Sequence, residues 1–94
     1  MRNYEVVFIV HPDLEESAFK EITERVTGWI SEEGGIISKV DVWGKRDLAY
    51  PIRKKTEGQY VLLEAQMDPE FCTALEHNLG LTEPVMRFMV TRRD

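Results

Sequence analysis

The stretch NYEVVFIVHPDLEESAFKEITERVTGWISEEGG, residues 3–35, contains the pattern of a β-strand followed by the pattern of an α-helix. Residues 3–10 are rich in β-branched and aromatic side chains and are apolar on both faces toward the end, which is typical of a central strand buried on at least one side. His11 and Pro12 end this strand, because proline donates no hydrogen bond to a sheet.

A helix is predicted over residues 14–33. Asp13 and Glu16 have the spacing of a capping box, in which each side chain accepts a hydrogen bond from a backbone N–H at the start of the helix. Gly34 and Gly35 end it, because glycine tolerates the left-handed conformation found at many helix C-termini. The apolar stripe of the helix consists of Ala18, Phe19, Ile22, Val26, Trp29 and Ile30.

Two further strands joined by a hairpin follow the helix. Residues 36–43 contain several β-branched side chains, Gly44 marks a bulge, and residues 48–52 continue as extended chain. Residues 54–58 are predicted as the hairpin tip, and residues 59–67 as the next strand. One face of that strand consists of Tyr60, Leu62, Glu64 and Gln66.

The last two elements are a second helix and a fourth strand. Asp68 is a favourable N-cap residue and Pro69 suits the first helical position, so a helix is predicted to begin here and to end at Gly80. Residues 85–91, which follow Pro84, have the composition of a strand.

The order of elements is therefore strand, helix, strand, strand, helix, strand, in what we expect to be a single domain over residues 1–94. Right-handed connections turn this order into an α+β, ferredoxin-like βαββαβ sandwich, with a four-stranded antiparallel sheet and both helices on one face. The other face of the sheet has no helix left to cover it. We expect the functional surface on this open face.

The composition excludes several classes of protein. The chain has 94 residues, of which 43% are hydrophobic and 31% charged, as expected for a soluble globular domain. Its one cysteine, Cys72, has no partner for an internal disulfide, so no oxidising compartment is required. No run approaches the roughly 20 apolar residues that span a membrane, so a cytosolic protein without a membrane partner is expected.

No catalytic or metal-binding constellation can be assembled from the sequence. His11 and His77 lie on different elements without cysteines or carboxylates at ligand spacing, and Cys72 suits a small core position. A ferredoxin-like acyl-phosphate hydrolase needs an arginine loop after the first strand, where residues 11–13 are His-Pro-Asp. We therefore expect no enzyme, no cofactor, no metal and no small-molecule substrate. The remaining alternative is a ferredoxin-like small-molecule regulatory module.

The net charge of −5 argues at first against nucleic acid as a partner, because phosphate binding is usually carried by a basic domain. The distribution of charge changes this conclusion. Residues 1–35 and residues 64–86 each carry a net charge of −5, mainly on the predicted helices. Residues 36–63 carry +3 and residues 87–94 carry +2, so the basic side chains gather on the hairpin and at the C-terminal end.

The predicted open face lacks the base-stacking signature of RNA-recognition motifs, which share this fold. In residues 57–64, Glu-Gly-Gln-Tyr-Val-Leu-Leu-Glu, the glycine of that signature is present, but Leu62 and Glu64 offer a poor platform for bases. Recognition of single-stranded bases is therefore disfavoured. Contact with the phosphates of a folded RNA, or with a protein, stays open.

Three parts of the sequence are distinctive: the opening MRNYEV at residues 1–6, the run WGKRDLAYPI at residues 43–52, and the spacing from that run to Gly58 and Tyr60. Together they resemble the bacterial small-subunit ribosomal protein six family. The resemblance covers essentially the whole chain and implies the same ferredoxin-like sandwich. Many relatives continue into a C-terminal tail beyond the position of Asp94, so contacts that depend on a tail are not expected here.

The resemblance implies a structural constituent of the small ribosomal subunit, cytoplasmic or in an organelle ribosome of bacterial type. It would bind 16S ribosomal RNA in the central domain, or platform, as a heterodimer with ribosomal protein eighteen. The expected RNA contacts are Arg2, Lys45, Arg46, Arg53, Lys54, Lys55, Arg87, Arg92 and Arg93. The expected contacts with the partner protein are Trp43, Tyr50, Tyr60, Leu62 and Met89. With a net charge of −5, the chain is expected to bind RNA weakly until a basic partner joins it.

Overall fold

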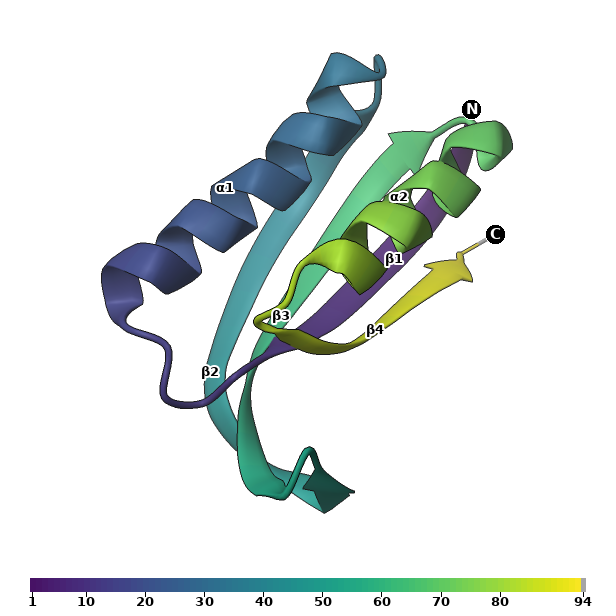
Figure 1. The fold of residues 1–94 in the computed structure, drawn as a ribbon. Helices are drawn as coiled ribbons and strands as arrows, with labels where there is room; N and C mark the ends of the chain where they lie inside the picture. Colours follow the sequence, from purple (N-terminus) through teal and green to yellow (C-terminus); the bar gives the residue numbers. More distant parts are fainter. Residues whose placement is uncertain (94) are drawn as a thin grey trace.

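The chain folds into four strands and two helices in the order predicted from the sequence (Figure 1). A computed structural model describes residues 1–93, so Asp94 lies outside the described residues. The elements are β1 (Arg2–Val10), α1 (Glu16–Glu32), β2 (Ile36–Ile52), β3 (Lys55–Met67), α2 (Pro69–Leu81) and β4 (Val85–Arg92).

The four strands form one antiparallel sheet in the order β2-β3-β1-β4. Figure 1 shows both helices on the same side of this sheet, with the other side uncovered. The predicted ferredoxin-like sandwich with one open face is therefore confirmed.

The hydrophobic core lies between the two helices and the covered face of the sheet. β1 and β3 are the central strands, and alternate residues along them, such as Phe8 and Leu63, are completely buried. Ile30 of α1 and Leu75 of α2 belong to the same buried cluster. Because successive side chains of a strand point to opposite faces, the intervening residues of β1 and β3 lie on the open face.

Helix α1 begins later than predicted. Its N-cap residue is Glu15, which makes no side-chain capping bond, and the carboxylate of Asp13 instead accepts a hydrogen bond from Lys55. The predicted capping box was therefore wrong. The end of the helix is as predicted: Gly34 has a φ of 81°, and the N–H of Gly35 donates to the carbonyl of Ile30 at 2.9 Å.

Helix α2 begins as predicted, with Asp68 at the N-cap position and Pro69 as the first helical residue. Its predicted end at Gly80 was wrong, because the helix continues to Leu81. Thr82 closes this end by two hydrogen bonds. Its backbone N–H donates to the carbonyl of Leu79 at 3.2 Å, and its hydroxyl donates to the carbonyl of Asn78 at 2.8 Å.

The hairpin between β2 and β3 has a shorter turn than predicted. The turn consists of Arg53 and Lys54, which have φ angles of 51° and 64°, and Ile52 pairs directly with Lys55. Two-residue hairpin turns with positive φ at both positions match the twist of the flanking strands. The predicted tip at residues 54–58 was therefore wrong, because residues 55–58 belong to β3.

Strand β2 is interrupted at three places where its register with β3 shifts. One shift lies between Ile37 and Lys39, and a second lies at the predicted bulge of Gly44, whose φ is 78°. At the third, the four residues 48–51 of β2 lie opposite the single residue Thr56 of β3. These irregularities accompany the bend of the hairpin, whose end extends past β1 in Figure 1.

Candidate functional site

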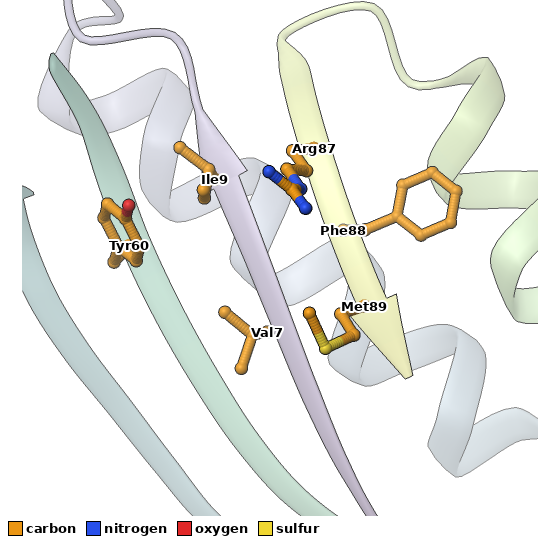
Figure 2. Close-up of a pocket in the computed structure, with 6 residues that line it drawn as sticks. All are labelled: Val7, Ile9, Tyr60, Arg87, Phe88 and Met89. Carbon is orange, nitrogen blue, oxygen red and sulfur yellow. The ribbon is translucent and has the colours of Figure 1, made fainter. Parts of the chain in front are cut away.

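The open face of the sheet carries a group of apolar side chains from three strands. The antiparallel register places Ile9 of β1 between Tyr60 of β3 and Arg87 of β4. Two residues earlier in β1, Val7 pairs with Met89 of β4. These five side chains line a hollow of about 190 Å³ (Figure 2).

Three residues at or near this hollow are largely covered. Ile9 lines it but is only 7% exposed. Phe88 borders the hollow, but Figure 2 shows its ring pointing away from the other side chains, and it packs against the core. Leu62 lies on the open face but is only 9% exposed, between Val7 of β1 and Asp41 of β2. Leu62, an expected contact with the partner protein, is therefore mostly covered, because β3 is a central strand and side chains from both neighbours flank this residue.

Trp43 extends the apolar surface onto the edge strand β2. Its ring stacks on Tyr60, with 6.0 Å between the ring centroids and 15° between the planes. Its Nε1–H donates to the carboxylate of Asp41 at 2.9 Å, which fixes the orientation of the indole. We name the group Val7, Ile9, Trp43, Tyr60 and Met89 the open-face cluster.

A second aromatic contact joins the hairpin to β4. The guanidinium of Arg87 donates a hydrogen bond to the hydroxyl of Tyr50 and lies 5.5 Å from the centroid of its ring. Tyr50 is 54% exposed and belongs to the extra residues of β2 that have no partners on β3. The bend of the hairpin therefore brings a residue of the edge strand β2 next to β4, at the opposite edge of the sheet.

Two predicted RNA contacts, Arg53 and Lys55, form hydrogen bonds within the protein. The guanidinium of Arg53 donates to the backbone carbonyls of Glu83 at 2.8 Å and Val85 at 3.3 Å. The ammonium group of Lys55 donates to the carboxylate of Asp13 at 3.1 Å. Both contacts bind the hairpin to residues far away in the sequence, in the α2–β4 and β1–α1 connections.

Three other predicted RNA contacts on the hairpin are exposed. Lys45, Arg46 and Lys54 make no side-chain hydrogen bond or ion pair within the described part of the chain. Asp47 of β2 and Glu57 of β3 lie opposite one another in the strand register. They are the two acidic residues within residues 45–58. The unpaired cations are therefore concentrated where the hairpin leaves the sheet.

Three more predicted RNA contacts, Arg2, Arg92 and Arg93, lie at the far end of the sheet, whereas Arg87 bonds to Tyr50 as described above. Arg2 begins β1, Arg92 ends β4, and the backbone N–H of Arg93 donates to the carbonyl of Asn3 at 2.8 Å. The guanidinium of Arg93 also pairs with Glu64 of β3, so its charge is partly neutralised. Basic side chains thus lie at both ends of the sheet, with Arg2 and Arg92 at the strand positions of the helix-covered face, as Tyr4 is.

Two titratable groups have pKa values displaced by their neighbours. The hydrogen bond from Lys55, together with its positive charge, lowers the pKa of the Asp13 carboxyl. A hydrogen bond with Cys72, with burial as a further cause, raises the pKa of the Tyr4 hydroxyl. Both groups lie away from the open-face cluster, and both shifts belong to structural contacts.

The residues considered for catalysis or metal binding have structural roles. His11 accepts a hydrogen bond at Nδ1 from the backbone N–H of Asp13 at 3.2 Å, within the turn after β1. Cys72 is buried in the core. Within residues 1–93, no three His, Cys, Asp or Glu side chains are placed to hold a metal ion. Over the same range, no helix combines the length and apolar character needed to cross a membrane.

The sequence did not identify Val7 and Ile9 as part of the surface. The signal was present, because residues 3–10 are apolar on both faces toward the end of the strand. The sequence also did not show that Arg53 and Lys55 form internal bonds. Their partners lie 30 and 42 residues away, so no local pattern contains them.

This combination of fold and surface defines a small ferredoxin-like domain with an apolar open face and cations at both ends of its sheet. Comparisons with known proteins identify the family. The family model described as Ribosomal protein S6 matches residues 3–92. The chain belongs to the ribosomal protein S6 family, whose members have a structural, non-enzymatic role in the ribosome.

Individual relatives agree with this membership over nearly their full length. Small ribosomal subunit protein bS6 of Clostridium novyi (strain NT) is 49% identical over 90 residues, covering 96% of this chain and 95% of the relative. The protein of the same description from Moorella thermoacetica is 45% identical over 92 residues, covering 98% and 94%. The crystal structure of 30S ribosomal protein S6 from Thermotoga maritima superposes with a TM-score of 0.93 at 34% identity, covering 98% of this chain and 87% of that one.

Proposed function

We propose that this chain binds 16S ribosomal RNA in the central domain, or platform, of the small ribosomal subunit as a heterodimer with ribosomal protein eighteen. It acts there as a structural constituent that aids assembly, in the cytoplasm or in an organelle with ribosomes of bacterial type. Its relatives are described as small ribosomal subunit proteins, which supports placing the chain in that particle.

The observation that carries the proposal is that two surfaces lie apart on the molecule. One is apolar and has no helix over it, and the other consists of exposed cations that make no ion pair within residues 1–93. The open-face cluster has no helix over it, and within it Trp43 is 40% and Met89 54% exposed. Exposed apolar patches that include aromatic residues and methionine are typical of protein interfaces. The protein partner therefore covers the open-face cluster and Tyr50, with Leu62 as part of its floor.

The RNA contacts lie beside this interface. Lys45, Arg46 and Lys54 are exposed and make no ion pair within residues 1–93, so their charges are available to phosphates. Arg2 and Arg92 provide positive charge at the other end of the sheet. The further basic residues assigned to the RNA-facing surface, which also make contacts within the protein, are Arg53, Lys55, Arg87 and Arg93.

The charge balance explains why a partner is needed. The chain carries 17 acidic and 12 basic side chains, so the few cations near the RNA compete with repulsion from the rest of the molecule. A basic partner bound to the open face supplies positive charge and extends the contact with RNA. RNA affinity is therefore a property of the heterodimer.

Titration of a 16S central-domain RNA tests the proposal directly. The isolated chain, the partner alone and the equimolar mixture are compared by filter binding at physiological salt. We expect weak binding by the isolated chain and tight binding by the mixture. Tight and specific binding by the isolated chain, or no gain on adding the partner, would contradict the proposal.

The regulatory-module alternative is less well supported by the geometry. The hollow on the open face has a volume of about 190 Å³ and the hollow beside Arg53 one of about 290 Å³, both below the roughly 300–1,000 Å³ of small-molecule pockets. A thermal-shift screen against amino acids and nucleotides separates the two functions. A metabolite at about 100 times its dissociation constant would add about 2.7 kcal/mol of stability, and we expect no compound to do so.

A further inference from the structure

The end of the β2–β3 hairpin extends past the rest of the sheet. The last pair between β1 and β3 joins Val10 to Gln59, so residues 46–58 form no ladder with β1. We name this segment, residues 46–58, the hairpin end. With no third strand beside it, its position relative to the domain depends on side-chain contacts, because an isolated two-stranded hairpin is only marginally stable in water.

Arg53 joins the hairpin end to the α2–β4 connection. Its two terminal nitrogens donate to two different backbone carbonyls, those of Glu83 and Val85, on either side of Pro84 in the α2–β4 connection. The same side chain lines a hollow with His11 of the β1–α1 connection. Arg53 therefore lies between the two connections at this end of the sandwich.

Two more contacts hold the same segment. Lys55 pairs with Asp13 in the β1–α1 connection, and Tyr50 accepts a hydrogen bond from Arg87 of β4. Of these three side chains, Arg53 alone binds the domain through backbone atoms. Carbonyl oxygens do not titrate and do not depend on a side-chain rotamer, so this contact defines the position of the turn most rigidly.

The backbone at Arg53 also indicates a requirement for its side chain. Arg53 and Lys54 both have positive φ, a conformation that asparagine and glycine adopt at lower energy than residues with long side chains. Two cationic residues occupy the turn instead. At Arg53 the side chain bonds to the domain, whereas at Lys54 it is exposed and makes no ion pair within residues 1–93.

We propose that Arg53 is a positioning residue for RNA binding, which fastens the hairpin end to the α2–β4 connection and thereby holds Arg46 and Lys54 in one arrangement before RNA arrives. The proposal rests on the RNA-binding function inferred above. A preorganised surface avoids the entropic cost of ordering the segment on binding. Arg53 therefore acts on RNA through its neighbours, in place of the direct phosphate contact expected from the sequence.

Salt dependence separates a positioning residue from a residue that binds a phosphate directly. Removing one phosphate-binding cation reduces the slope of log affinity against log salt by about 0.7–0.9, whereas removing a positioning bond lowers the affinity at every salt concentration. Four heterodimers with substitutions are compared with the wild type on a 16S central-domain RNA: Arg53→Gln, Arg53→Lys, Lys54→Gln and, as a control at an exposed position of α1, Lys20→Gln.

We expect Arg53→Gln to weaken binding about fivefold to tenfold with an unchanged slope, the effect that follows from removing hydrogen bonds of ordinary strength. Arg53→Lys keeps the charge but removes the planar fork, so it is expected to weaken binding to a similar extent. Lys54→Gln reduces the slope and Lys20→Gln changes neither quantity. Wild-type affinity in Arg53→Lys, or a slope reduced by Arg53→Gln, would overturn the proposal in favour of direct phosphate binding.

Hydrogen exchange on the free chain tests the positioning without RNA. Arg53→Gln and Arg53→Lys are expected to accelerate exchange at least threefold in the amides of the hairpin end, and to leave the β1 amides unchanged. Lys54→Gln is expected to have no effect. Unchanged exchange in the Arg53 variants would overturn the positioning role even if RNA binding is intact. Absence of RNA binding by the wild-type heterodimer would instead overturn the proposed function.

Discussion

The indole of Trp43 stacks on the phenol of Tyr60 across two neighbouring strands, with 6.0 Å between the ring centroids and 15° between the planes. Tyr60 pairs with Ile9 on the open face, so the stacked pair lies on the side of the sheet that carries no helix, and the Trp43 N–H is bonded to Asp41. Rigid aromatic side chains of this kind lose little conformational entropy when a partner packs on them. Their position marks the centre of the proposed interface with ribosomal protein eighteen.

Trp43→Ala is expected to weaken the heterodimer by about 2 kcal/mol, because central aromatic residues contribute most to interface affinity. Isothermal titration with the partner protein measures the change. Leu81→Ala is the matched control, since Leu81 is a highly exposed apolar residue at the end of α2 and lies outside the open-face cluster. Equal effects of the two substitutions would place the interface elsewhere.

The double substitution of Arg46 and Lys54 by Ala is expected to lower the affinity of the heterodimer for its RNA. It should also reduce the salt slope by about 1 unit for each phosphate that the variant no longer neutralises. The two side chains are exposed and have no internal ion pair in the described residues. Filter binding at several salt concentrations provides the slope. A slope equal to that of the wild type would show that both side chains face solvent in the complex.

The ion pair between Asp13 and Lys55 predicts a dependence of stability on pH. The hydrogen bond and charge of Lys55 lower the pKa of Asp13 in the folded chain, with His11 and Lys45 as smaller contributors. The stabilisation is therefore present above the unfolded value of about 3.9 and disappears as the pH falls through the lower, folded value.

Asp13→Asn is accordingly expected to lower the free energy of unfolding at pH 7. The difference from the wild type is expected to shrink as the pH falls below about 3.9 and through the lowered folded value, because the wild-type carboxyl then becomes neutral as well. Urea unfolding across this range measures the difference. Asp47→Asn serves as the control, because Asp47 is an exposed carboxylate of the same hairpin without an ion pair among the described residues. A pH-independent difference for Asp13→Asn would contradict the assignment.

Gly58→Ala is expected to destabilise the chain by about 1–3 kcal/mol, as overpacking of a filled site does. A Cβ at this position would overlap with the Cγ2 atom of Ile9, which lines the hollow on the open face. Gly28→Ala in α1 is the control, because no atom lies within 4 Å of its Cβ position, and it is expected to stabilise by about 0.5–1 kcal/mol. An unchanged urea midpoint for Gly58→Ala would show that Ile9 moves aside without cost.

The sequence predicted the order of all six elements because each has a local signal: alternation in strands, an apolar stripe in α1, and glycine or proline at the boundaries. The errors arose where a distant residue changed a local preference. Asp13 has the spacing of a helix cap but pairs with Lys55. Gly80 is a residue type that often ends helices, but α2 continues to Leu81 and the hydrogen bonds of Thr82 close its end.

The candidate site was predicted in part for the same reason. Charge by segment located the basic residues, and the absence of a third layer located the open face. Which cations are internally bonded depends on the bend of the hairpin, which brings Tyr50 to Arg87 and Arg53 to Glu83. The left-handed turn at Arg53 that produces these contacts has neither of the usual turn residues, asparagine or glycine.

The three shifts in the register of β2 have a consequence for self-association. β2 is an edge strand of 17 residues with exposed Val40 and Val42 on one face and Trp43 on the other, a composition that favours aggregation through unpaired backbone groups. Bulges disrupt the regular spacing of N–H and C=O groups that an incoming strand requires. The irregularities at Ile37, Gly44 and residues 48–51 divide the edge into short segments, which protects the chain from edge-to-edge pairing with other copies during the interval between synthesis and assembly.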